Sequence, residues 1–186
     1  MLPDQKLKIL FLPAWYPNKY DQMAGLFVQQ HARAIQAFAD VAVLQIVQYA
    51  GATRHQIEER NEDGIFVYRI YLKSVKAPFI GKIINGLNYR WSTKYAYEQL
   101  KQKWGKPDMC HVHILTRAGW LALNLWQKCK IPYVISEHWS RYFEQNSNSY
   151  EGTARKKYTE KIVKHAKAVM PVSEILKEAM LKNGLH

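Results

Sequence analysis

The fold is decided by residues 132–143, PYVISEHWSRYF, where an apolar run ends abruptly in Glu137, His138 and Trp139. A short run rich in Val and Ile is typical of a strand that is buried on both faces of a parallel sheet. Ligands of open parallel sheets bind outside the carboxyl ends of the strands. Polar side chains also occur wherever a strand turns into water. The stretch therefore has two interpretations, a ligand site and an ordinary strand end.

Apolar runs of this kind alternate with helical patterns along the chain. The patterns predict strands over residues 8–13, 40–47, 64–72, 109–114, 132–138 and 168–173, and helices over residues 25–38, 80–104, 116–129, 153–166 and 174–183. This alternation indicates an α/β fold, doubly wound, with a mostly parallel sheet and helices on both faces. A length of 186 residues suits one domain, so we expect a single domain over residues 1–186.

Two of the predicted helices carry apolar residues at spacings of three and four, which predicts the faces that pack on the core. In the helix over residues 25–38 these are Phe27, Ala34, Ile35 and Phe38, and His31 is expected on the same inward face. In the helix over residues 80–104 they are Ile80, Ile84, Leu87, Trp91 and Tyr95. In the last helix, Ser173 is expected as the N-cap and Gly184 as the C-cap glycine.

The chain is strongly basic, with a net charge of +12 and a pI near 9.6. An anionic partner is therefore expected, and nucleic acid, anionic lipid and phosphorylated small molecules all qualify. Residues 73–106 contain eight Lys or Arg and one acidic residue, Glu98, with aromatic residues interleaved. This segment could be a solvated basic face above a packed apolar face, or an amphipathic helix on an anionic membrane. Because Trp91 and Tyr95 are predicted to face the core, nucleic acid is not expected as a partner.

Composition and cysteine usage favour a cytoplasmic globular protein. Apolar residues make up 48% of the chain and charged residues 23%, and no apolar run reaches the length of a bilayer span. Residues 1–17, MLPDQKLKILFLPAWYP, are typical of a first strand rather than of a secretion signal. Cys110 and Cys129 are predicted to be reduced thiols.

The sequence lacks the common phosphate and nucleophile motifs. No G-x-G-x-x-G follows the first strand, and neither G-x-x-x-x-G-K-[ST] nor G-x-S-x-G occurs, so dinucleotide-binding, P-loop and serine-hydrolase functions are disfavoured. Ala24 and Gly25 lie at the start of a predicted helix. Helix N–H groups there could bind a phosphate or a sugar hydroxyl, although a turn glycine is the simpler interpretation.

His111 and His113 form an H-x-H pattern in a predicted strand, so both side chains point to the same face. Three interpretations are open: chelation of a metal ion, a packed pair held by hydrogen bonds, and contact between His113 and a ligand. The packed pair is favoured, because only Glu137 and His138 on another strand could supplement the two imidazoles. No metal and no other cofactor are expected.

An ordered set of segments resembles a known family. The segments are KILFLPAWYP (8–17), AGLFVQQHARAI (24–35), DVAVL (40–44), PDMCHVHI (107–114), IPYVISEH (131–138) and AVMPVSEILKEAMLKNGL (168–185). Together they resemble the amino-terminal domain of family-four retaining glycosyltransferases of the GT-B fold. The resemblance covers nearly the whole chain and is weakest across residues 50–106.

The resemblance implies a two-domain enzyme for cell-envelope or polysaccharide synthesis, of hexosyltransferase type. This half would hold a glycan or lipid-linked acceptor, and a carboxyl-terminal half would hold the nucleotide-sugar donor. The family's Glu-x7-Glu motif does not occur in this sequence, so we expect a fragment of a longer protein that is inactive alone. Two alternative functions are kept: a nucleotide-sugar epimerase of the same fold, and a basic nucleic-acid-binding module.

The resemblance also implies site residues. His138 matches the family's histidine at a strand end that faces the cleft, and is the expected catalytic residue. Ala24 and Gly25 match a Gly-Gly pair, with Ala24 as a departure from it. His113, Glu137 and Trp139 are expected to contact the acceptor or the donor, although the motif itself does not define their roles.

Overall fold

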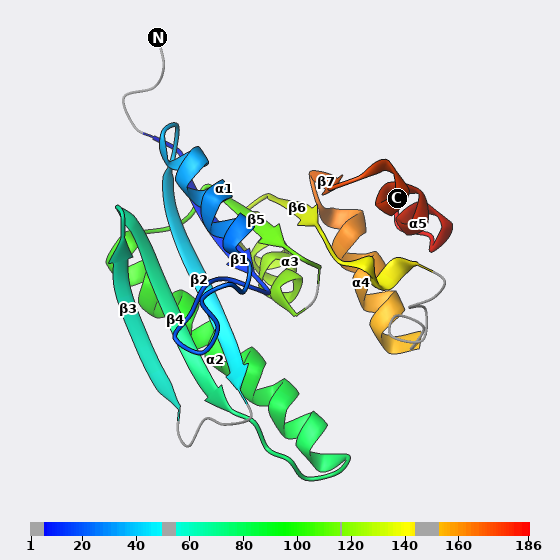
Figure 1. Ribbon diagram of the computed structural model, residues 1–186, viewed down its shortest axis with the longest axis horizontal. Helices are drawn as coiled ribbons and strands as arrows, with labels where there is room; N and C mark the ends of the chain where they lie inside the picture. The colour runs from blue at the N-terminus through cyan, green and yellow to red at the C-terminus, as the bar shows by residue number, and fades with distance from the viewer. Residues whose placement is uncertain (1–5, 50–54, 116, 144–152) are drawn as a thin grey trace. The chain divides into compact units, whose positions relative to one another are not determined.

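The computed structural model describes residues 6–49, 55–115, 117–143 and 153–186 (Figure 1). The chain divides into two compact units, residues 1–108 and residues 109–186. The predicted single domain over residues 1–186 stays a prediction. No helix in the described part of the chain has the length and apolar content needed to cross a bilayer.

The first unit is a sheet of four strands with one helix on each face. The strands are β1 (Lys8–Pro13), β2 (Asp40–Tyr49), β3 (Gln56–Glu62) and β4 (Ile65–Lys73), in the order β3-β4-β2-β1. β1, β2 and β4 are parallel, and β3 is an antiparallel edge strand. The helices α1 (Leu26–Gln36) and α2 (Ile80–Trp104) both contact β2 and β4, and Figure 1 shows them on opposite faces.

The second unit has three parallel strands, β5 (Met109–His113), β6 (Tyr133–Glu137) and β7 (Ala168–Pro171), in the order β5-β6-β7. Its helices are α3 (Ala118–Cys129), the short 3-10 helix η1 (Ser140–Tyr142), α4 (Thr153–His165) and α5 (Glu174–Lys182). The predicted α/β class with a mostly parallel sheet is therefore confirmed.

The strands form because their apolar runs can be covered from both sides. Leu10, Phe11, Ala42, Val43 and Val67 in the first unit have no exposed surface. The same holds for Cys110, Val112, Tyr133 and Ile135 in the second unit. A parallel strand buried on both faces needs such a continuous apolar run.

The caps predicted for the last helix are both confirmed. The hydroxyl of Ser173 accepts a hydrogen bond from the N–H of Leu176, at 3.2 Å, and so caps the first turn of α5. Gly184 follows the helix with a φ of 78°, in the left-handed region that glycine adopts without strain.

β3 is a strand that the sequence patterns did not predict. It contains one large apolar residue, Ile57, which is exposed. Backbone pairing with β4 and ion pairs such as Glu58–Arg69 and Glu59–Lys103 hold it in place. Asp63 and Gly64 both have positive φ, 53° and 88°, as the two-residue turns of β-hairpins require. An edge strand stabilised by charge has no apolar alternation to predict it.

The predicted core-facing side of α1 is wrong. The buried residues of this helix are Val28 and Ala32, whereas His31 and Phe38 are exposed. Phe38, one of the four residues that defined the predicted face, lies beyond the end of the helix, and each buried position is one residue after a predicted one, Phe27 or His31.

The predicted face of α2 is also wrong. Its buried positions hold mostly small or polar residues, namely Gly81, Ser92, Thr93, Ala96, Tyr97 and Leu100. Ile80, Leu87, Trp91 and Tyr95, which were predicted to face the core, are exposed. The reason is Asn85, whose side chain accepts from the N–H and donates to the carbonyl of Val75, at 2.9 and 3.0 Å. These bonds hold the side of the helix that carries Asn85 against the segment between β4 and α2.

Candidate functional site

In the first unit, Gly25 begins α1 in a conformation that excludes other residues. Its φ is 63°, and a Cβ atom would lie 2.2 Å from the carbonyl oxygen of Trp15. The N–H of the preceding residue, Ala24, donates to the carboxylate of Asp21 at 3.0 Å. The structure therefore gives Gly25 a turn role that needs no ligand, and Ala24 an N–H that already has an acceptor.

The loop between β1 and α1 is bound by the side chain of Arg69 on β4, which is only 2% exposed. The guanidinium donates to the carbonyl of Pro17 at 2.7 Å and to the side chain of Gln45 at 2.6 Å. Gln45 in turn donates to the carbonyl of Tyr16 at 2.9 Å. A guanidinium presents several donors in one plane, so a single side chain can tie the loop to two strands.

The charge of Arg69 is balanced by Glu58 on β3, at 2.7 Å. The hydroxyl of Tyr71 also donates to this carboxylate, at 2.6 Å. Burial raises the pKa of Glu58, but the hydrogen bonds from Tyr71 and Arg69 outweigh burial and bring the pKa below its ordinary value. The edge strand thus contributes the counter-ion on which the loop depends.

Aromatic rings gather near this loop. The rings of Tyr20 and Tyr49 stack with centroids 4.1 Å apart, and Tyr71 meets Tyr20 edge-on at 5.2 Å. The ammonium of Lys19 lies 4.1 Å from the centroid of Tyr71. Tyr49 ends β2, and Tyr20 and Tyr49 are both partly exposed. No sequence pattern identifies this group, because its members come from separate segments and share no motif.

In the second unit, Glu137 organises the end of β6. Its buried carboxylate accepts four hydrogen bonds, each at 2.9 Å. The donors are the N–H groups of Leu115, His138 and Trp139 and the hydroxyl of Tyr142. Each oxygen accepts two hydrogen bonds, so the carboxylate holds the surrounding backbone in place.

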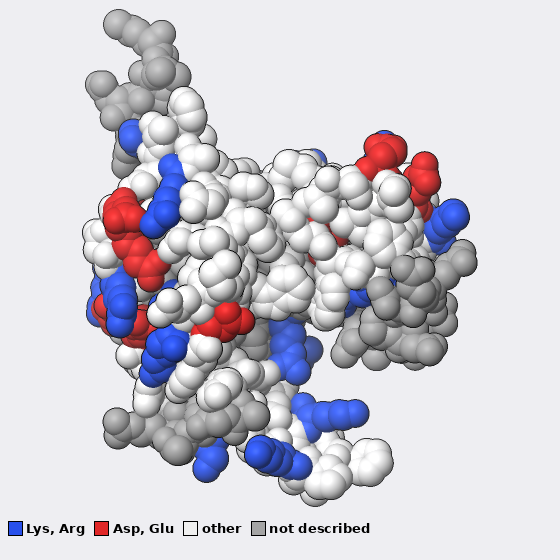
Figure 2. Space-filling view, in the orientation of Figure 1, with Lys and Arg blue, Asp and Glu red and all other residues white. Residues whose placement is uncertain are grey.

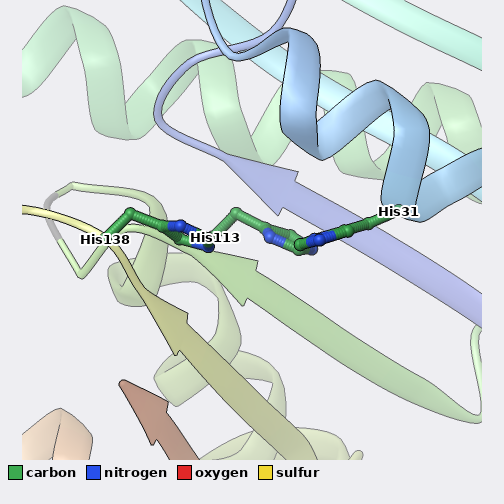
Figure 3. A group of neighbouring side chains, drawn as sticks. All are labelled: His31, His113 and His138. Atoms are coloured by element: carbon green, nitrogen blue, oxygen red, sulfur yellow. The ribbon is translucent and has the colours of Figure 1, made fainter. Parts of the chain in front are cut away.

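His113 and His138 lie beside each other at the ends of β5 and β6 (Figure 3). Their ring centroids are 6.4 Å apart, with an angle of 26° between the planes. His113 is buried, whereas His138 is partly exposed. The Nε2 atom of His138 is nevertheless buried, and its backbone N–H is held by Glu137.

His111 and His113 also form a packed pair, as favoured from the sequence. Their ring centroids are 4.0 Å apart, and Nε2 of His111 lies 2.9 Å from the hydroxyl of Ser136. The expectation of no metal stays a prediction.

The backbone directly after His113 is strained. Ile114 has a φ of 68°, although its β-branched side chain disfavours the left-handed region, and it is fully buried. Its N–H donates to the carbonyl of Ser136 at 2.9 Å, and the next N–H is bound by Glu137. Strain of this kind costs of order 1–3 kcal/mol and clusters at functional sites.

Trp139 is covered on one face by Arg141, whose guanidinium carbon lies 3.6 Å from the indole ring centroid. Arg141 is buried, and the pair is a cation–π contact. Neither Arg141 nor Tyr142 was identified from the sequence, although both directly follow the SEHW segment at the strand end. The structure thus brings His113, Glu137, His138 and Trp139 together in the second unit, whereas Ala24 and Gly25 lie in the first.

Comparisons with known proteins give consistent results. Residues 24–186 match a family model described as Glycosyltransferase Family 4. A curated protein of Bacillus subtilis (strain 168), the putative teichuronic acid biosynthesis glycosyltransferase TuaC, is 24% identical over 188 residues. That match covers 95% of this chain and 46% of TuaC, so the chain spans about half the length of its relative.

A solved structure shares the fold. It is described as "Trehalose-6-phosphate from E. coli bound with UDP-2-fluoro glucose" and matches with a TM-score of 0.55 at 9% identity. The match covers 95% of this chain and 42% of that one. At this identity the likeness concerns the fold alone.

The carboxylate of Glu58 should make stability depend on pH. Because its pKa in the folded chain lies below the ordinary 4.5, its stabilising effect is complete above that pH. The effect is lost as pH falls through the lowered pKa. Urea unfolding should show Glu58→Gln less stable than the wild type by about 2 kcal/mol at neutral pH, with the difference disappearing in acid. The exposed Glu98→Gln serves as the control, and a difference that persists in acid contradicts the assignment.

The four bonds of Glu137 predict a large cost for a small change. In Glu137→Gln an amide NH₂ group replaces one carboxylate oxygen. The two donors that were bound to that oxygen then face another donor and lose their acceptor. We expect a loss of about 2–4 kcal/mol in the free energy of unfolding, measured by urea denaturation. Glu178→Gln, on the surface of α5, should change it by less than about 0.5 kcal/mol. Equal stability of the two variants would show that Glu137 does not hold the strand end.

Proposed function

Because the chain belongs to glycosyltransferase family 4, we propose that it is the acceptor-binding half of an enzyme that transfers a sugar from a nucleotide-sugar donor. The sequence resemblance to this family is confirmed by the family model over residues 24–186. The GT-B class of the resemblance agrees with the shared fold of the UDP-2-fluoro glucose complex. The activity is that of a transferase, and we assign it to the hexosyltransferase type.

The acceptor that we propose is a glycan or a lipid-linked precursor in cell-envelope or polysaccharide synthesis, used at the cytoplasmic side. Support comes from TuaC, whose description assigns it to teichuronic acid biosynthesis. At 24% identity this relative supports the kind of pathway rather than a particular sugar.

One observation carries the proposal: His138 lies at the carboxyl end of β6, next to His113, on a backbone that Glu137 holds in place. Ligands of parallel sheets bind at this edge. A fixed imidazole can exchange a proton or donate a hydrogen bond where charge develops during transfer. We assign His138 as the catalytic residue and Glu137 as a positioning residue that acts through the backbone of the strand end.

Neighbouring groups fit contacts with an anionic sugar substrate. The guanidinium of Arg141, stacked on Trp139, places a positive charge three residues after His138. A buried positive charge near the strand end favours an anionic substrate. His113 supports the site from the adjacent strand. In the first unit, the partly exposed rings of Tyr20 and Tyr49 with Lys19 offer a separate surface for the acceptor.

The 186-residue chain on its own should fold without transferring sugar. Donor and acceptor must be held together for transfer, and this chain spans 46% of its curated relative. Calorimetric titration with UDP-sugars should detect no tight binding, and product analysis should detect no transfer. Glycosyl transfer by this chain alone would contradict the assignment of an acceptor-binding half.

In an enzyme that contains this chain and a donor-binding half, His138→Ala should lower kcat by about 100-fold or more. His55→Ala, at an exposed position of the first unit, should leave kcat unchanged. Thermal midpoints of both variants separate catalysis from folding. A folded His138→Ala enzyme with normal kcat would rule out the catalytic assignment, whereas a lower midpoint at normal kcat would indicate a structural role.

A further inference from the structure

The first half of α2 exposes its large apolar side chains instead of burying them. The outer stripe comprises Phe79, Ile80, Ile83, Leu87 and Trp91, which are 86%, 63%, 65%, 60% and 69% exposed. Contiguous apolar surface of this kind is rare on soluble proteins and marks an interaction site. The stripe therefore needs a partner.

This orientation is built into the packing of the helix. Asn85 is bound to the backbone of Val75, and Gln48 donates to the carbonyl of Asn85 at 3.0 Å. A Cβ on Gly81 would lie 2.7 Å from the carbonyl of Val75, so the backbones approach closely on this side. At the other end of α2, the indole N–H of Trp104 donates to Asp40 at 3.0 Å. The helix cannot roll to bury the stripe without breaking these contacts.

The charge around the stripe has one sign. Residues 73–97 contain five basic residues and no acidic residue, namely Lys73, Lys76, Lys82, Arg90 and Lys94. All five are exposed. Figure 2 shows Lys and Arg, and no Asp or Glu, around the end of α2 that begins at Ile80. An apolar stripe within a basic surface complements an anionic surface with an apolar interior.

We propose that the outer stripe docks on an anionic lipid bilayer, with α2 lying in the plane of the interface. Basic amphipathic helices bind there through burial of the apolar face and attraction to anionic head groups. Trp91, which stacks on Tyr95 with ring centroids 5.6 Å apart, is of a residue type enriched at this depth. This inference is independent of the proposed sugar transfer, because docking needs no sugar.

Two other occupants fit the stripe less well. Single-stranded nucleic acid binds through aromatic rings on which bases stack, whereas three of the five stripe residues are aliphatic. A second copy of this chain would bring two basic surfaces together, and like charges facing each other oppose association. An anionic bilayer satisfies both the apolar and the charged parts of the surface.

The test is co-sedimentation of the 186-residue chain with phosphatidylcholine vesicles that contain or lack phosphatidylglycerol. We expect binding to the anionic vesicles that weakens with added salt, and little binding without phosphatidylglycerol. Ile83→Glu should weaken binding by at least about tenfold. Ile175→Glu on α5 is the matched control, because Ile175 is 69% exposed and its substitution adds the same charge.

Two further variants separate the apolar and the electrostatic parts. Lys76→Gln and Lys82→Gln should each weaken binding by roughly fivefold and reduce its salt dependence. Trp91→Phe should abolish the blue shift of tryptophan emission that vesicles cause. Circular dichroism checks that all variants remain folded.

Four outcomes overturn the proposal. The first is no salt-sensitive binding to anionic vesicles, and the second is equal loss of binding in Ile83→Glu and Ile175→Glu. The third is binding of a single-stranded oligonucleotide through the stripe in place of vesicles. The fourth is a dimer in solution that Ile83→Glu converts to monomer, which would assign the stripe to a second copy.

Discussion

The second unit depends on the carboxylate of Glu137, which accepts four hydrogen bonds where β6 ends. A buried charge is costly unless hydrogen bonds compensate it fully, and here each oxygen accepts two. The donors come from the turn after β5, from the two residues after Glu137, and from η1. One side chain thus fixes the strained turn at Ile114 and the backbone of His138 together. This explains why an apolar strand ends in a carboxylate.

The first unit uses a buried cation in a comparable way. Arg69 on β4 ties the carbonyl of Pro17 to Gln45 on β2, and Glu58 on β3 supplies the opposite charge. Each unit therefore holds its irregular segments with a buried ionic group rather than with regular secondary structure. Such groups give a loop one defined conformation, which a ligand site requires.

Much of the architecture could be predicted from the sequence, because apolar runs covered on both sides of a parallel sheet leave a strong local pattern. β3 could not be predicted in that way, because its stability comes from charged residues such as Glu58 and from backbone pairing. The orientation of α2 was predicted wrongly for a related reason. The periodicity of Ile80, Leu87 and Trp91 identifies an apolar face but does not say whether the core or a partner covers it, and Asn85 decides this through tertiary contacts. Likewise, the residue types at Glu137 and His138 indicate a strand-end site. The four hydrogen bonds that give Glu137 a positioning role are seen only in the folded structure.

We propose that two neighbours at the end of β6 have separate roles: the carboxylate of Glu137 fixes the strand end, and the imidazole of His138 contacts the substrate. The most direct measurement is a crystal structure of an enzyme containing this chain with a nucleotide sugar and an acceptor bound. We predict the imidazole of His138 within hydrogen-bonding distance, about 3 Å, of the transferred sugar or the acceptor, with the carboxylate of Glu137 still bound to the protein alone. A substrate that contacts Glu137 while the imidazole of His138 points away from it would rule out these roles.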